Sequence, residues 1–260
     1  MRSVAFEIGG STLPVFETRQ GICMMSFAKF AFILFSRSSM DFDKLNPFSS
    51  CDVADALRKL GKKDFFIPDL SSFAASSGEF KFIGSAYTIK VEDVKQRGLP
   101  FYEDNFHWLD KASSHNVVIL SGPKGAPNAV FGGLMGARAK HLGVQGVVVG
   151  GRIRDTSELK SFGLNVVAYG KSAMGAGGFT QVTGVNVPIE FPTASPKVSQ
   201  VKVVPGDIVV ADQDGVVIVP LDCIDEVEKI CKHIVEVDGK CMEDIISGKT
   251  IFEAFKAHRS

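Results

Sequence analysis

The chain has 260 residues, of which 45 % are apolar and 22 % charged, a composition typical of a globular protein with one sizeable core. Its 29 basic and 29 acidic side chains cancel, so no net field attracts nucleic acid or an anionic membrane. The five cysteines lack the C-x-x-C spacing of a zinc knuckle, and their odd number does not suit a disulfide framework. We therefore expect reduced thiols in a cytoplasmic protein that binds neither nucleic acid nor membrane.

Residues 1–39 differ in composition from the rest of the chain. Their apolar segment, CMMSFAKFAFILF, contains a lysine and spans thirteen residues, which is too short to cross a bilayer. Arginines and serines suggest an organelle presequence, and hence a mitochondrial protein, but Glu7 and Glu17 do not fit that pattern. Translation from Met40 is the other interpretation. We expect residues 1–39 to be disordered or absent from the mature protein, and residues 40–260 to form a single domain with C-terminal helices.

The first elements of that domain are a short helix and a strand. Ser49 and Asp52 have capping-box spacing, and Gly61 can end the helix that they begin. Residues 80–91 are rich in β-branched and aromatic side chains, which indicates a strand. Gly84 within it predicts a bulge or a close approach of another backbone.

Strands and helices then alternate. Short apolar runs predict strands at the ranges 116–120, 144–150 and 165–170. The first helix between them follows FGG and presents Leu134, Ala137 and Leu142 on one side, and the second covers 155–163. Because a strand, a helix and a strand in that order form a crossover, we expect these strands to be parallel.

The segment from 182 to 219 changes to closely spaced strands joined by Pro-Gly and Asp-Gly turns, which is typical of antiparallel ribbons. An amphipathic helix follows at 222–237, and we expect a second helix after Gly239. The fold class is therefore α/β with a mixed sheet.

Several familiar motifs fail on spacing. GKS at 170–172 lacks the first glycine of a P-loop, and no G-x-G-x-x-G follows a strand. DQDG at 212–215 lacks the bidentate glutamate of a calcium loop and predicts a tight turn instead. The five histidines show no metal-ligand spacing.

Two features remain as candidates for chemistry. FGGLMG at 131–136 puts bare backbone at a helix start, where N–H groups and the helix dipole attract a carboxylate or phosphate, although glycines there also permit close helix packing. Arg154 and Asp155 follow the next strand, at the edge where open α/β sheets bind ligands. Asp155 can alternatively be the N-cap of the following helix, with Arg154 as its ion-pair partner. An arginine fork and a hard carboxylate oxygen suit an anionic substrate and a magnesium-type cation.

The spacing Gly133, twenty residues, Arg154-Asp155, two residues and Glu158 resembles the signature of a known enzyme family. It is similar to the class II 4-hydroxy-4-methyl-2-oxoglutarate/4-carboxy-4-hydroxy-2-oxoadipate aldolases, which share a superfamily with the regulator of ribonuclease activity A. GSAYTI at 84–89, AYG at 168–170 and PGDIVVADQDGVVIVP extend the resemblance over about residues 48–237. The GGLM and GRIRD segments resemble those of fungal homologues.

The resemblance implies an α/β/β/α sandwich that forms homotrimers or hexamers with sites between subunits. It implies that the pyruvoyl carboxylate of a substrate binds the backbone of Gly132, Gly133, Leu134 and Met135, that Arg154 holds the keto acid, and that Asp155 ligates Mg²⁺ or Mn²⁺. Glu158 would act through metal-bound water. Glu226 and Glu228 are candidates for an acidic side chain that one subunit contributes to the active site of its neighbour.

Two functions follow from this resemblance. The first is a metal-dependent lyase, an aldolase or oxaloacetate decarboxylase, in which a pyruvate enolate forms when a carbon–carbon bond breaks. The second is a non-catalytic binding protein of the same fold, like the ribonuclease regulators. The presence of Arg154, Asp155 and Glu158 together favours the enzyme.

Overall fold

The computed structural model describes residues 3–8, 11–18, 21–23, 42–73, 80–94, 106–193, 195, 198 and 200–259. The chain divides into two units, Met1–Asp41 and Phe42–Ser260. The first unit is an antiparallel sheet of β1 (Ser3–Ile8), β2 (Ser11–Thr18) and β3 (Gly21–Cys23). Beyond Cys23, the apolar segment of the sequence lies outside the described residues. That residues 1–39 are disordered or absent from the mature protein, and that the rest is a single domain, stay predictions.

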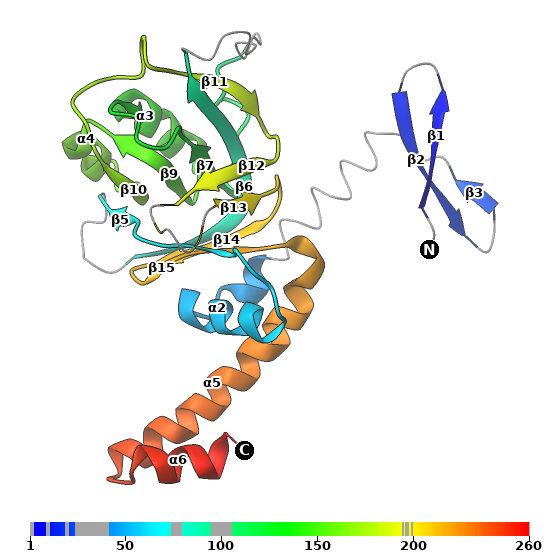
Figure 1. Cartoon of the computed structure of the whole chain (residues 1–260), viewed down its shortest axis with the longest axis vertical. Helices are drawn as coiled ribbons and strands as arrows, with labels where there is room; N and C mark the ends of the chain where they lie inside the picture. Colours follow the sequence, from blue (N-terminus) through cyan, green and yellow to red (C-terminus); the bar gives the residue numbers. More distant parts are fainter. Residues whose placement is uncertain are drawn as a thin grey trace. The chain divides into compact units, whose positions relative to one another are not determined.

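The second unit is built on a mixed sheet (Figure 1). Its strand order is β4-β15-β14-β6-β7-β9-β10-β5, with β11 beside β6 and β8 beside β9. Strands β6, β7, β9 and β10 are parallel, as the alternation of strands and helices predicts, and β14 and β15 are antiparallel. The bounds are β4 (Phe66–Ile67), β5 (Ser71–Ser72), β6 (Lys81–Asp93), β7 (Asn116–Ser121), β8 (Ala129–Phe131), β9 (Gly146–Ile153), β10 (Val166–Lys171), β11 (Thr180–Val185), β14 (Ile208–Asp212) and β15 (Gly215–Val219).

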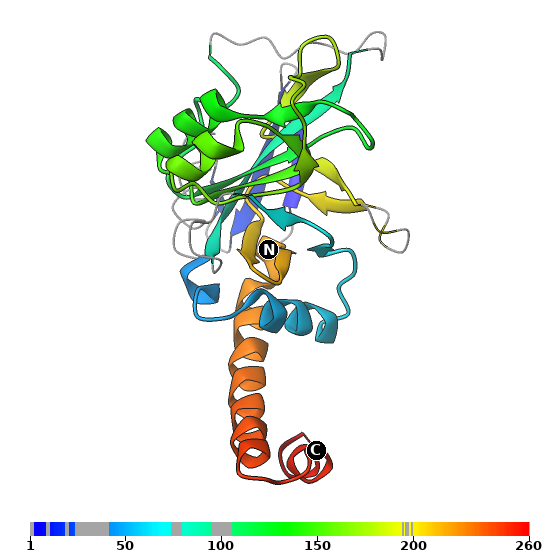
Figure 2. The ribbon, with the colours of Figure 1, turned by 90° about the vertical axis from the view of Figure 1, so that its left-hand side faces the viewer.

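Helices and a small ribbon complete four layers. Helices α3 (Gly133–Leu142) and α4 (Thr156–Ser161) cover one face of β7, β9 and β10 (Figure 2). The other face packs against β14, β15 and the ribbon of β12 (Ile189–Pro192) and β13 (Gln200–Val203). Outside β14 and β15 lie α2 (Ser50–Lys59) and α5 (Ile224–Ile246), together with the short turns η1 (Phe42–Leu45) and η2 (Leu221–Cys223). This order of layers confirms the expected α/β/β/α sandwich.

Helix α2 is fixed at its first turn. Ser49 and Asp52 form the predicted capping box. The buried carboxylate of Asp212 then accepts hydrogen bonds from the N–H of Ser50 at 2.7 Å and from its hydroxyl at 2.6 Å. Because Asp212 and Gly215 pair across the turn between β14 and β15, the predicted tight turn also anchors the helix.

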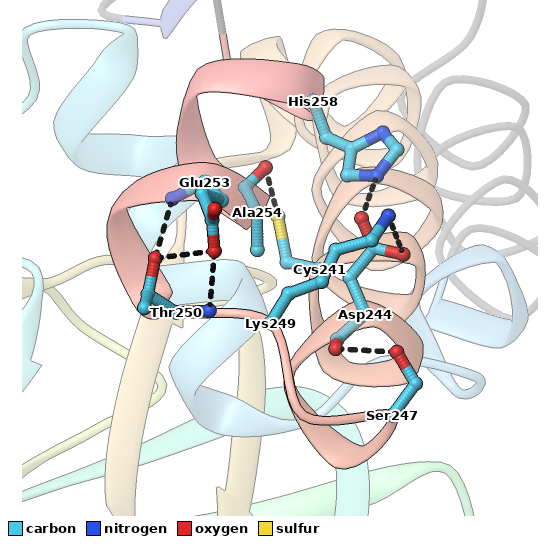
Figure 3. A network of polar contacts seen from close by, with 8 residues as sticks. All are labelled: Cys241, Asp244, Ser247, Lys249, Thr250, Glu253, Ala254 and His258. Carbon is cyan, nitrogen blue, oxygen red and sulfur yellow. Dashed lines mark hydrogen bonds and ion pairs between the residues drawn. The ribbon is translucent and has the colours of Figure 1, made fainter.

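The prediction of a second helix after Gly239 is wrong in its boundary. Helix α5 continues through Gly239 to Ile246, because a single glycine costs only about 1 kcal/mol in a helix. Helix α6 (Ile251–His258) follows Gly248, whose φ is +100°. Its capping box of Thr250 and Glu253, and the contacts of Asp244 with Lys249 at 2.8 Å and His258 at 3.0 Å, close the helical hairpin (Figure 3).

Among the described residues, every helix is too short or too polar to cross a bilayer. Four cysteines of this part, Cys51, Cys223, Cys231 and Cys241, are free thiols.

Two positions, Gly84 on β6 and Gly146 on β9, show why glycine is needed within the sheet. A Cβ at Gly84 would lie 2.7 Å from the His115 carbonyl oxygen, which is the close backbone approach expected from the sequence. A Cβ at Gly146, on β9, would lie 2.4–2.7 Å from three atoms of the Phe82 ring. Phe82 is buried among the strands, so its ring has no free space into which it can move.

We predict that Gly146→Ala lowers the free energy of unfolding by about 1–3 kcal/mol through overpacking. Gly177→Ala is the matched control, because a Cβ there meets no atom within 4 Å. Urea denaturation followed by circular dichroism measures both. Equal stability of the two variants would contradict the packing described for β9.

Candidate active site

The site is built at the start of α3. Strand β8 ends at Phe131, Gly132 is extended, and the helix begins at Gly133. The N–H of Gly136 is bonded to the Gly132 carbonyl at 2.9 Å. The three preceding N–H groups, those of Gly133, Leu134 and Met135, therefore have no partner within the helix and point from its positive end.

Asp155 meets this helix start. Strand β9 ends at Ile153, and the N–H of Arg154 donates to the Phe131 carbonyl at 3.0 Å, which brings the two chain segments together. Asp155 has φ +56° and ψ +41°, and its Oδ2 accepts the N–H of Gly133 at 3.0 Å. Although Asp155 stands at the N-cap position of α4, its side chain makes no capping bond there. The carboxylate instead caps α3.

Arg154 lies beside the same carboxylate. Its Nε is 3.3 Å from Asp155 Oδ2, and its side chain is 45 % exposed. A Cβ at Gly132 would lie 2.9 Å from Arg154 Cγ, and one at Gly175 would lie 2.9 Å from Nη1. Gly175 was missed by the sequence reasoning, although its position in the glycine-rich MGAGGF segment after β10 is a signal for the same sheet edge.

Glu158 is the third charged group. It lies in the first turn of α4, and a Cβ at Gly133 would be 1.8 Å from its Oε2. The carboxylate therefore lies directly over the Gly133 backbone. The glycines of FGGLMG thus have different roles, because Gly132 and Gly133 admit side chains to the helix start, whereas Gly136 permits close contact with Leu159 of α4.

The apolar face predicted for α3 is wrong at Leu134 and Ala137, which are exposed, whereas Leu142 packs against the core. Gly133, Gly136 and Ala139 are the buried residues, whereas Leu134 is 81 % exposed. The reason is that α3 packs against α4 so closely that only glycine and alanine fit between them. Because the glycine and alanine side of α3 faces inward, the opposite side, which carries Leu134, faces solvent.

Several polar atoms of the site are available to a ligand. Within the described part of the chain, the N–H groups of Leu134 and Met135 have no acceptor, and neither Asp155 Oδ1 nor the Glu158 carboxylate has a donor. Two free N–H groups beside a guanidinium suit a carboxylate, because each can donate to one of its oxygens. The arrangement therefore has the donors for an anion and the acceptors for a cation.

The carboxylate oxygens of the site supply part of the ligand set that Mg²⁺ or Mn²⁺ requires. No group of three or more His, Cys, Asp or Glu side chains that could hold a metal occurs in the described ranges. Asp155 and Glu158, however, both lie against Gly133. Magnesium commonly takes one or two protein carboxylates and completes its octahedron with water and substrate oxygens, so two carboxylates at a partly exposed site satisfy its usual requirement.

Glu226 and Glu228 lie elsewhere in the same chain. Both are on α5, which packs with α2 on the outer face of β14 and β15, and Glu228 is paired with Lys232 at 2.6 Å. One chain therefore does not bring them to α3. Their contribution to a neighbouring subunit stays a prediction.

Comparison with known proteins finds matches to a large part of the chain. The model of the RraA-like family, described as Aldolase/RraA, matches residues 50–218. The 4-hydroxy-4-methyl-2-oxoglutarate aldolase of Thermus thermophilus is 30 % identical over 57 % of this chain and 81 % of its own length. Protein DlpA of Legionella pneumophila is 27 % identical over 79 % of this chain, but the match spans only 32 % of DlpA.

A solved structure agrees with the sequence comparisons on the fold. Streptomyces coelicolor RraAS2, described as an unusual member of the RNase ES inhibitor RraA protein family, superposes with a TM-score of 0.63. The superposition covers 80 % of this chain and 96 % of RraAS2 at 22 % sequence identity.

We predict that Asp155→Ala lowers the free energy of unfolding by about 1 kcal/mol, because the N–H of Gly133 loses its cap. Asp155→Asn should cost less, since the amide oxygen can still accept that bond. Thermal unfolding of both variants measures the difference. A loss above about 3 kcal/mol for Asp155→Ala would mean that the carboxylate supports more of the fold than one helix end.

Proposed function

Since the chain belongs to the RraA-like family, we propose that it is a divalent-metal-dependent lyase that cleaves a carbon–carbon bond of a pyruvoyl-containing oxo acid. The candidate substrates are 4-hydroxy-4-methyl-2-oxoglutarate, by aldol cleavage, and oxaloacetate, by decarboxylation. The observation that carries the proposal is the pair of free N–H groups at Leu134 and Met135, placed beside Arg154 and two carboxylates.

Substrate binding follows from these donors. The carboxylate of the pyruvoyl group would accept the N–H groups of Leu134 and Met135, with the positive end of α3 behind them. Arg154 would donate hydrogen bonds to the keto acid, because its guanidinium is a planar, two-pronged donor. Its side chain lies against Gly132 and Gly175, which keeps it close to the helix start. The keto carbon would then face the carboxylates of Asp155 and Glu158.

Asp155 Oδ1 would hold the divalent cation, with the Glu158 carboxylate close by on the same side of Gly133. When bound, Mg²⁺ or Mn²⁺ supplies Lewis acidity that stabilises negative charge on the keto oxygen. Asp155 is suited to this role because its Oδ2 is already fixed by the Gly133 N–H and by Arg154, so the orientation of the other oxygen is set before the cation arrives.

The bond cleavage leaves the same product fragment from either substrate. In oxaloacetate, the electrons of the bond to the distal carboxylate move toward the keto carbon, CO₂ departs, and the enolate of pyruvate remains to be protonated at carbon. In aldol cleavage, a base must also remove the proton of the 4-hydroxyl group. We assign proton transfer to Glu158 because its carboxylate lies over Gly133 with no donor among the described residues.

A ribonuclease regulator of the same fold is the competing function. The likeness to RraAS2 is one of fold alone, at 22 % identity, and the balanced charge of the chain gives no attraction for nucleic acid. Homotrimeric or hexameric assembly, a cytoplasmic location and a fungal relationship stay predictions.

We predict that the purified protein releases pyruvate from oxaloacetate or from 4-hydroxy-4-methyl-2-oxoglutarate with Mg²⁺, and that a chelator abolishes the release. A lactate dehydrogenase assay follows pyruvate, with an enzyme-free sample containing the same Mg²⁺ to subtract spontaneous decarboxylation. Absence of metal-dependent release from both substrates would overturn the lyase proposal.

Arg154→Lys separates substrate recognition from stability. It should lower kcat/KM by about 10²-fold or more, because an ammonium cannot reproduce the bidentate fork or its charge stabilisation. Arg138→Lys is the matched control, since Arg138 is also partly exposed and paired with an aspartate, Asp110, at 2.8 Å. Similar kinetics of the two variants would show that Arg154 does not recognise the substrate.

A further inference from the structure

A second hollow lies where β9 and β10 meet the β12 ribbon. Its volume is about 440 Å³, within the range of small-molecule sites. The loop after β7 forms one wall, and the ends of β9, β10 and β12 form the others. Its lining includes Asp69, Pro123, Lys124, Arg152, Tyr169 and Pro192.

This hollow is separate from the site at α3 because its lining contains none of the residues of that site. Ile153 packs in the cluster beneath α3 and α4. A Cβ at Gly150 would meet Pro192 and Phe191 of β12 at 3.0–3.1 Å, so Gly150 faces the ribbon. Arg152 lines the hollow, and it belongs to the strand itself, which extends three residues beyond the predicted end at residue 150.

The walls of the hollow are largely apolar. Pro123, Ala126, Pro192 and the ring of Tyr169 contribute carbon surface. The Tyr169 hydroxyl donates to the Pro192 carbonyl at 2.9 Å, which ties the ribbon to β10 and sets the orientation of the ring. A flat apolar group therefore finds preformed walls here.

The charged groups of the hollow favour an anion. Arg152 donates from Nη1 to the Lys171 carbonyl at 3.1 Å, which holds the guanidinium over Gly170 and leaves its other N–H groups available. Neither Arg152 nor Lys124 forms an ion pair with any described residue. Among the described residues of the lining, Asp69 is the one carboxylate, and the two cations Arg152 and Lys124 exceed it by one positive charge.

We infer that this hollow binds a small organic carboxylate with a flat apolar body. The carboxylate is held by Arg152 and Lys124, and the apolar body lies against Tyr169 and the two prolines. A bidentate guanidinium contact with a carboxylate is among the stronger polar contacts available at a protein surface. The inference does not depend on the lyase activity, because it uses none of the groups at α3.

The test uses 4-fluorobenzoate as the probe, observed by ¹⁹F NMR in a titration of the full-length protein. We expect saturable binding that Arg152→Gln and Lys124→Gln each weaken by about tenfold, the loss typical of one hydrogen bond to a charged group. Lys229→Gln, an exposed lysine on α5, is the matched control and should leave the affinity unchanged. The neutral analogue 4-fluorobenzyl alcohol should bind more weakly than the carboxylate.

Two further samples distinguish this hollow from the site at α3. Affinity for 4-fluorobenzoate should be unchanged in Arg154→Lys and in the presence of excess pyruvate with Mg²⁺. Binding that survives Arg152→Gln but is lost in Arg154→Lys would place the probe at α3 and overturn the inference. Absence of binding at millimolar probe, or equal binding of the neutral alcohol, would overturn it as well.

Discussion

The hydrogen bond from the Gly133 N–H to Asp155 Oδ2 is the contact on which the candidate site depends. It joins the start of α3 to the junction of β9 and α4, so the anion-binding end of one helix and the charged residues before the next become one structure. The bond requires a bare backbone, because a Cβ at Gly132 would lie 2.8 Å from the same oxygen. It also uses one oxygen of Asp155 and thereby fixes the direction of the other.

This contact in turn depends on the parallel strands. Strands β7, β9 and β10 end at the same edge of the sheet, so the segments that follow them meet there. Close packing of Gly136 against Leu159 holds α3 and α4 together, and the buried cluster of Phe131, Ile153 and Leu159 lies beneath the charged residues. A rigid apolar base of this kind keeps exposed side chains in position without many polar contacts of their own.

The sequence predicts the strands, their parallel order and the meeting of FGGLMG with Arg154 and Asp155, because hydrophobic periodicity and strand order determine these features. It does not predict which helix Asp155 caps, since that choice depends on a contact between residues 22 positions apart. The same limit explains Leu134, whose exposure follows from the closeness of α4 rather than from the periodicity of α3. Gly239 and Arg152 show a second limit, because packing extends α5 and β9 past the points where local sequence suggests an end.

The most direct test of the account is an NMR titration of ²H,¹⁵N-labelled protein with pyruvate in the presence of Mg²⁺. If the start of α3 is the carboxylate site, the amide resonances of Leu134 and Met135 and the Nε–H resonance of Arg154 shift together, and Arg154→Lys weakens the response of the two amides. If these resonances stay unchanged at saturating pyruvate, or if the shifts occur only elsewhere in the chain, the assignment of the site is contradicted.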